Sequence, residues 1–284
     1  MSQTRISGQC RQARFEYAPL GSNDIRLVQL ESFNHERGIV EFTMTQERLD
    51  SSDFLALSYT WGDPIRTKMI LLNGQPLRIT LNLEGFLRTF ATGHPEMNHS
   101  KLWIDAICIN QEDLEERNAQ VLRMSSIYSS AQEVIVWLGE QTEEAAVEYA
   151  EMTRLCEQLA VSDDSHKENV YLDILESFTI MSRLGRMDFL LNSPWWRRLW
   201  VLQEFVLAKR VRFLRGLVDM DYHVLFEIVY GVVSRGAFPL KPEDLEWKYK
   251  WSSILNLLEL RPREDLRRVD LLSSTSPDSA CWTS

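Results

Sequence analysis

The stretch of sequence that decides the fold runs from Leu102 to Gly139: LWIDAICINQEDLEERNAQVLRMSSIYSSAQEVIVWLG. Its two ends are short apolar runs typical of buried strands, and the segment between them repeats apolar residues at helical spacing. A strand, a polar loop, an amphipathic helix and a second strand in this order are typical of an α/β sheet. Ligands bind to open α/β sheets where strands end and helices begin, so this stretch also indicates where a functional site should lie.

Further strands and helices are predicted around this stretch. Ile25–Leu30, Ile39–Met44 and the almost continuously apolar Phe54–Tyr59 are predicted strands. Asn73-Gly74 favours a tight hairpin turn, and 82–92 has the apolar spacing of a helix. Because strands and helices alternate, we predict an α/β fold with a mainly parallel sheet and helices on both faces, followed by C-terminal helices.

A second informative block follows Ser193-Pro194, where we predict one helix rich in tryptophan. Glu204 lies in this block among apolar residues, so its carboxylate must be paired, neutralised or functional. A functional role and an ion pair to Arg197, Arg198 or Arg117 are equal alternatives at this point.

Composition excludes several classes of protein. The 284 residues include 31 Lys and Arg against 41 Asp and Glu, and the resulting net charge of −10 argues against a nucleic-acid binder. No secretory signal and no apolar run long enough for a membrane segment is found. The scattered cysteines and histidines predict no metal site, and the absence of paired cysteines favours a cytoplasmic protein. The four cysteines are Cys10, Cys108, Cys156 and Cys281.

Four sequence blocks resemble the fungal heterokaryon incompatibility (HET) domain. They are FLALSYTWGDP at 54–64, ITLNLEGFLR at 79–88, residues 102–140, and WWRRLWVLQEFVLAKRVRFLRG at 195–216. The resemblance implies an effector in fungal self/non-self recognition and programmed cell death that works through protein partners or self-association. It implies no bound cofactor.

HET domains are also distantly similar to TIR domains, which implies a TIR-like, flavodoxin-like core. Ser58-Tyr59 matches the end of the first TIR strand, and Asp105 matches the acidic end of the second. Trp200 and Glu204 have the Trp-x-x-x-Glu spacing in which the glutamate of NAD-cleaving TIR domains is catalytic. The similarity therefore implies NAD as a substrate and Glu204 as the catalytic residue.

The residues that would bind NAD are taken from the same regions, each with a structural alternative. Tyr59 and Trp61 could stack on a base or pack in the core, and Ser58 precedes them. Asp105 could bind a ligand or cap the following loop. Arg117 could bind phosphate, although an ion pair with a carboxylate is favoured. The alternative for the whole domain is a non-catalytic signalling or protein-interaction module with the same fold.

The predicted domain organisation has four parts. Residues 1–24 form a flexible arm, 25–220 the HET domain, and 221–272 a helical extension that follows it. Helices are also predicted at 143–159 and 172–184 inside the domain. The tail, residues 273–284, is predicted to be disordered and truncated relative to the family pattern.

Overall fold

The computed structural model describes residues 15–140, 193–198, 202–234 and 244–261, together with residues 150, 154, 176 and 177. The chain divides into two compact units. The first comprises Met1–Ala146 and Ser193–Asp219, and the second comprises Val147–Asn192 and Met220–Ser284. The helices predicted at 143–159 and 172–184 fall almost entirely outside the described residues, as does the tail. The predicted domain boundaries stay predictions.

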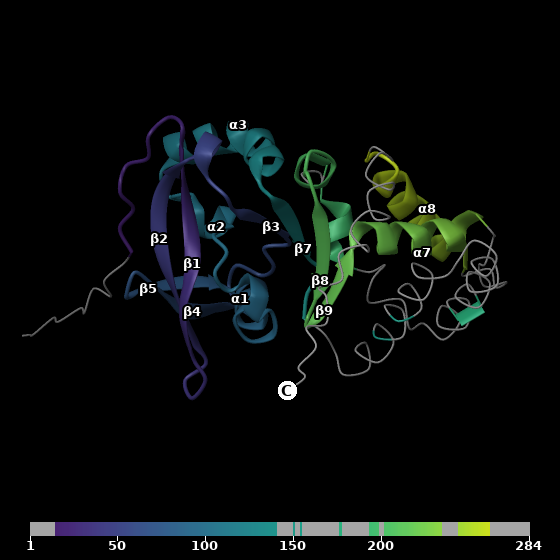
Figure 1. Ribbon diagram of the computed structural model, residues 1–284, viewed down its shortest axis with the longest axis horizontal. Helices are drawn as coiled ribbons and strands as arrows, with labels where there is room; N and C mark the ends of the chain where they lie inside the picture. The colour runs from purple at the N-terminus through teal and green to yellow at the C-terminus, as the bar shows by residue number, and fades with distance from the viewer. Residues whose placement is uncertain are drawn as a thin grey trace, which may run out of the picture. The chain divides into compact units, whose positions relative to one another are not determined.

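Nine strands form one sheet in the order β5-β4-β2-β1-β6-β3-β7-β8-β9 (Figure 1). Their bounds in chain order are β1 Asp24–Asn34, β2 Ile39–Arg48, β3 Leu55–Tyr59, β4 Thr67–Leu72, β5 Gln75–Thr80, β6 Leu102–Trp103, β7 Glu133–Trp137, β8 Val211–Arg215 and β9 Val218–Asp221. The strand β3, whose five residues are all buried, lies between β6 and β7 and pairs with both in parallel.

The prediction of a mainly parallel, flavodoxin-like sheet is wrong, because the sheet is mixed and most of its pairing is antiparallel. The long β1–β2 ladder runs antiparallel from Asp24↔Arg48 to Asn34↔Ile39, and β4–β5 is also antiparallel. The β1–β6 pair is antiparallel as well. These antiparallel ladders hold most of the paired residues, while β2–β4, β3–β6, β3–β7 and β7–β8 pair in parallel.

Tight turns explain this difference. Gly38 with φ of 62° lies in the connection between β1 and β2, and Asn73 and Gly74 connect β4 to β5 with φ of 49° and 73°. Two positive φ values in a two-residue loop match the twist of an antiparallel hairpin, whereas parallel neighbours need a crossover of a dozen residues or more. The Asn73-Gly74 hairpin was predicted correctly, but the antiparallel pairing of the first two strands was not.

Three helices follow the strands of the first unit. The helix α1 spans Leu81–Gly93, α2 is a single turn at Asp105–Cys108, and α3 spans Leu114–Ser130. Asp113 is the N-cap of α3 and accepts hydrogen bonds from the backbone N–H groups of Glu115 and Glu116, each at 3.0 Å. This cap explains why the helix predicted between the two strands of 102–139 begins at Leu114.

An ion-pair network attaches the start of α3 to β1 and to the residues before it. Arg26, which is only 3% exposed, binds both carboxylate oxygens of Glu116 at 2.6 and 2.8 Å and donates to the carbonyl of Cys108 at 3.0 Å. Tyr17 donates to the carbonyl of Ile107 at 2.9 Å. Described residues of the predicted N-terminal arm therefore contact the first unit.

The predicted tryptophan-rich helix is replaced by two different elements. A short 3₁₀ helix, η3, spans Pro194–Arg197 and ends at Arg198, whose backbone is extended. A π-helical turn, η4, spans Leu202–Val206, and residues 199–201 between them are outside the described part. Trp195 is completely buried and packs edge-on against Phe213 of β8, with ring centroids 5.8 Å apart.

Two helices of the second unit are described, α7 at Tyr222–Ser234 and α8 at Asp244–Leu258. Both lie within residues 221–272, where the sequence predicted a helical extension. The Tyr222 hydroxyl donates to the carbonyl of Leu258 at 2.8 Å, and Leu258 is fully buried. Among the helices that the structure describes, none is long and apolar enough to cross a membrane.

Candidate functional site

The carboxyl ends of β3 and β6 bring together side chains that are far apart in the sequence. Ser58 and Tyr59 end β3, and Asp105 follows β6 as the first residue of α2. Because β3 and β6 are parallel neighbours, these ends lie at the same edge of the sheet. The sequence therefore predicted correctly where polar side chains would gather.

Glu204 from η4 lies at the centre of a fully hydrogen-bonded group. Arg198 donates to its two carboxylate oxygens, from Nη1 to Oε2 at 2.9 Å and from Nη2 to Oε1 at 3.0 Å. The Ser58 hydroxyl also donates to Oε2, and in turn accepts from the indole N–H of Trp195 at 2.7 Å. We call these four residues, Ser58, Trp195, Arg198 and Glu204, the Glu204 cluster.

Three of the four residues of the Glu204 cluster are buried. Glu204 is 0% exposed, and Ser58 and Trp195 are buried with it, whereas the Arg198 side chain keeps 20% of its surface exposed. A buried carboxylate needs compensation for the water that it loses, and a two-pronged guanidinium contact supplies both charge and hydrogen bonds. Of the three arginines considered as partners for Glu204, the structure identifies Arg198.

The π-helical turn explains how Glu204 reaches this position. A π-helical turn contains an extra residue relative to an α-helix, and such turns occur frequently at functional sites. In η4 the buried face carries both Glu204 and Phe205. Two neighbouring residues therefore point inward, the first to Ser58 and Arg198 and the second to the aromatic core around Phe213.

Asp105 forms a second polar contact at the same edge of the sheet. Its carboxylate accepts from the indole N–H of Trp61 at 2.7 Å and from the backbone N–H of Ala106 at 2.7 Å. The pKa of Asp105 is raised from 3.8 to about 6, chiefly because burial disfavours the charged carboxylate. The hydrogen bonds from Trp61 and Ala106 and the charge of Arg198 lower this pKa, whereas the negative charge of Glu204 raises it. Asp105 therefore titrates close to neutrality and could hold or release a proton there.

Two buried tyrosines border the same region. The Tyr128 hydroxyl donates to the carbonyl of Leu57 at 3.0 Å. The Tyr59 hydroxyl makes no hydrogen bond of acceptable geometry with the residues that the structure describes, although the Asp105 carboxylate is close enough to affect its pKa. Burial raises the pKa of both tyrosines well above 10, and the nearby charge of Asp105 adds to the effect. Neither phenol therefore ionises near neutral pH.

The remaining residues predicted for the site lie in different environments. Trp61 is 42% exposed and contacts Asp105, so it is not a core residue, whereas Tyr59 is 1% exposed. Arg117 lies on α3 and its guanidinium has no ion pair or hydrogen bond among the described residues, so neither its predicted ion pair nor a place in the Glu204 cluster is found. Cys108 is buried, and burial raises the pKa of its thiol to about 12, as expected for a structural cysteine.

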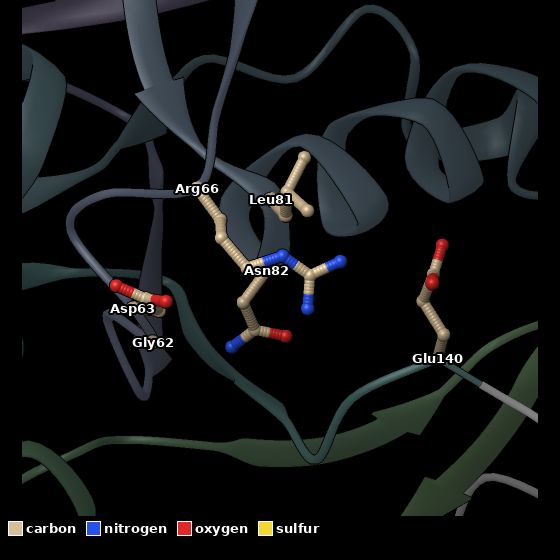
Figure 2. A pocket seen from close by; sticks show the side chains of 6 residues that line it. All are labelled: Gly62, Asp63, Arg66, Leu81, Asn82 and Glu140. Carbon is tan, nitrogen blue, oxygen red and sulfur yellow. The ribbon is translucent and has the colours of Figure 1, made fainter.

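The structure also contains a cavity of about 320 Å³ (Figure 2). It is lined by the loop that follows β3, by the first residues of α1 and by the loop that follows β7. Its lining residues are Gly62, Asp63, Arg66, Leu81, Asn82 and Glu140. Gly62 has φ of 79°, and a Cβ there would lie 3.3 Å from the Cβ of Asn82. A glycine at this position therefore permits the turn and leaves space in front of Asn82.

Sequence reasoning missed most of the cavity and one member of the cluster. Trp195 was predicted only as a core or interface residue, yet its indole N–H binds Ser58. Asn82 was placed correctly at the start of a helix, but its amide joins two strand ends, donating to the carbonyl of Thr60 at 2.5 Å and accepting from Trp137 at 3.0 Å. The polar residue at the start of an otherwise apolar helix was the available signal.

Comparisons with known proteins identify the family. The family model "Heterokaryon incompatibility protein (HET)" matches residues 54–204. The chain is also 30% identical over 194 residues to "Heterokaryon incompatibility protein 6, OR allele" of Neurospora crassa. That match covers 57% of this chain and 28% of the relative, so the chain spans well under half of the relative's length. No solved structure matches the chain. Because the family model covers more than half of its 284 residues, the chain belongs to the heterokaryon incompatibility (HET) protein family.

Proposed function

We propose that this chain acts in fungal heterokaryon incompatibility as a signalling domain that works through protein contacts rather than through catalysis. Family membership and the name of the Neurospora crassa relative support the biological role. The observation that supports a non-catalytic mechanism is the state of Glu204, which is fully buried with Arg198 and Ser58 on its carboxylate. Partner proteins or further copies of the chain would then receive the signal.

The contacts of the Glu204 carboxylate oppose a catalytic role. A catalytic acid, base or nucleophile must reach a substrate atom within hydrogen-bond distance. Both oxygens of Glu204 already bind Arg198, and the Ser58 hydroxyl binds Oε2 as well. In this conformation a substrate could reach the carboxylate only after the Arg198 guanidinium had moved away.

The second candidate function is NAD cleavage leading to cell death. The observation that favours it is Asp105, which has a pKa of about 6 at the edge of the sheet where ligands bind, close enough to Glu204 for their charges to interact. The spacing of Trp200 and Glu204 also resembles that of TIR domains. Under this proposal Arg198 masks Glu204 in a resting state, and its displacement would expose the carboxylate to the nicotinamide ribose.

One enzymatic experiment separates the two candidates. NAD turnover would be measured with the purified chain, at high concentration and after forced assembly through a fused oligomerisation tag, for the parent chain, Glu204→Gln and Arg198→Met. For a signalling domain we expect no turnover in any of the three. Glu36→Gln, at an exposed position with the same chemical change, is the control.

The opposite result would have a distinctive pattern. If Glu204 is a masked catalytic residue, Arg198→Met should cleave NAD faster than the parent chain, and Glu204→Gln should not cleave it at all. Circular dichroism must show that both variants are folded. A cellular assay adds independent evidence, because cell death on overexpression that persists with Glu204→Gln supports signalling without catalysis.

A further inference from the structure

We propose that the cavity at Arg66 is a binding site for a small hydroxylated molecule that carries a phosphate or carboxylate group. The site is separate from the Glu204 cluster and does not depend on the function proposed above. The observation behind it is that one charged group in the cavity, the Arg66 guanidinium, has no partner among the described residues, whereas its neighbours are engaged.

Several polar groups that line the cavity already make hydrogen bonds, which determines the atoms that remain available to a ligand. The Asn82 amide is used on both sides, by the carbonyl of Thr60 and the indole of Trp137. Glu140 binds Arg88 through Oε1, and Asp63 accepts from the backbone N–H of Ile65 through Oδ1 at 2.9 Å. The second oxygen of each carboxylate makes no hydrogen bond or ion pair with the residues that the structure describes, so each can accept a hydrogen bond from a ligand.

Arg66 is different because its side chain is exposed and forms no ion pair or hydrogen bond in the described part of the chain. Two hydrogen bonds nevertheless hold the backbone of Arg66. Its carbonyl accepts from the N–H of Leu81 at 3.1 Å, and its N–H donates to the carbonyl of Asp63 at 3.3 Å. Figure 2 shows its guanidinium extending over Asn82 into the space between Asp63 and Glu140.

The chemistry of these groups selects the ligand. A guanidinium presents parallel N–H donors that fit two oxygens of a phosphate or a carboxylate. The cavity, at about 320 Å³, is at the lower end of the range for small-molecule sites and is larger than a bare oxyanion requires. The free oxygens of Asp63 and Glu140 would accept from hydroxyl groups and would repel a second anionic group. One oxyanion on a hydroxylated body satisfies all three groups.

The N-terminus of α1 also favours an oxyanion in the cavity, although the proposal does not depend on it. Leu81 and Asn82 are the first two residues of α1, and the side chain of its N-cap Thr80 makes no capping hydrogen bond. The positive end of the helix dipole therefore borders the cavity, and the Glu84 carboxylate in the first turn offsets part of it. This adds favourable potential for an oxyanion bound to Arg66.

Isothermal titration of the full chain with four probes tests the proposal: glycerol 3-phosphate, glycerate, inorganic phosphate and glycerol. We expect at least one of the first two to bind, more tightly than inorganic phosphate, and glycerol not to bind. Preference between glycerol 3-phosphate and glycerate distinguishes the two oxyanions. Binding of neither, or binding of glycerol as tightly as of glycerol 3-phosphate, would overturn the proposal.

Variants connect the binding to the named residues. Arg66→Ala should weaken the binding by about tenfold or more, as expected for loss of a charge-assisted hydrogen bond, and Arg66→Lys should weaken it less. Arg37→Ala, which removes an equally exposed charge from the turn between β1 and β2, should leave it unchanged. Asp63→Asn should weaken binding of the hydroxylated probe and not of inorganic phosphate. Equal affinities of Arg66→Ala and Arg37→Ala would place the bound ligand elsewhere and refute the site.

Discussion

Arg198 binds both carboxylate oxygens of Glu204, at 2.9 and 3.0 Å, across the short gap between η3 and η4. The Arg198 side chain is 20% exposed, whereas the Glu204 carboxylate is entirely buried. The ion pair therefore joins a partly solvated cation to a carboxylate in the interior of the domain. Its consequences for stability can be measured separately from any consequence for activity.

Removal of the carboxylate should destabilise the domain strongly. Glu204→Ala leaves the Arg198 guanidinium and the Ser58 hydroxyl without their partner, and breaking a buried ion pair from one side costs about 3 kcal/mol. The free energy of unfolding from urea titration should fall by about this amount, whereas Glu36→Ala at an exposed position should change it by less than about 0.5 kcal/mol.

Replacement of both partners tests whether the pair itself is stabilising. Since two well-packed apolar side chains often replace a buried ion pair at little cost, Arg198→Met combined with Glu204→Leu should be more stable than Glu204→Leu alone. A double variant that is less stable than either single variant would contradict this explanation.

A matched pair of tyrosines gives the third prediction. Tyr128→Phe removes a hydroxyl that donates to Leu57 at 3.0 Å and leaves that carbonyl without this donor, so it should cost about 1 kcal/mol. Tyr59→Phe removes a buried hydroxyl that makes no hydrogen bond of acceptable geometry with the described residues, although Asp105 lies close to it, so this change should cost less than Tyr128→Phe. Both free energies of unfolding come from the same urea titration, and a larger loss for Tyr59→Phe than for Tyr128→Phe would show that the Tyr59 hydroxyl has a partner in solution.

The extent to which the fold could be predicted depended on local signals. The Asn73-Gly74 turn, the helix near 82–92 and the apolar strand before Thr60 were predicted because turn residues and periodicity act over short distances. The antiparallel pairing of β1 with β2 was not, because the sequence around Gly38 contains no comparably strong hairpin signal. Strand order, moreover, depends on the burial of whole faces rather than on any single segment.

The site could be predicted only in part for a related reason. Ser58 and Asp105 were singled out because the TIR resemblance places each at the end of a strand, and Glu204 was noticed because a carboxylate in an apolar segment needs compensation. The π-helical turn that directs Glu204 inward, and the extended backbone at Arg198 that allows the guanidinium to meet it, have no periodic signal. Arg117, chosen by position alone, lies outside the cluster.

The pKa of Asp105 predicts a pH dependence of stability. Its folded-state pKa of about 6 lies above the ordinary value of 3.8, so the folded chain holds the proton more tightly than the unfolded chain. This contribution to stability is fully present below pH 4 and is lost as pH rises through 6. Asp105→Asn cannot ionise, so between pH 4 and pH 7 the parent chain should lose stability relative to this variant, by on the order of 1 kcal/mol for a half-buried side chain.

The measurement is a series of urea titrations from pH 4 to pH 8 on the parent chain and Asp105→Asn. Asp53→Asn, at an exposed position, controls for the removal of one negative charge. If the stability difference between the parent chain and Asp105→Asn does not change over this range, or grows in favour of the parent chain as pH rises, Asp105 does not titrate as described.

Trp61 provides the last prediction, because its indole N–H is one of the few groups that stabilise the ionised form of Asp105. The 2.7 Å hydrogen bond lowers the pKa of Asp105 against the effects of burial and of Glu204. Trp61→Phe removes this donor and keeps an aromatic ring, so the pKa of Asp105 should rise above about 6. A carboxyl-carbon NMR titration measures this value directly, with the resonance assigned by its loss in Asp105→Asn. Ile65→Ala, in the same exposed loop, is the control and should leave the pKa unchanged. An unchanged or lower pKa in Trp61→Phe would mean that the indole does not bind the carboxylate in solution.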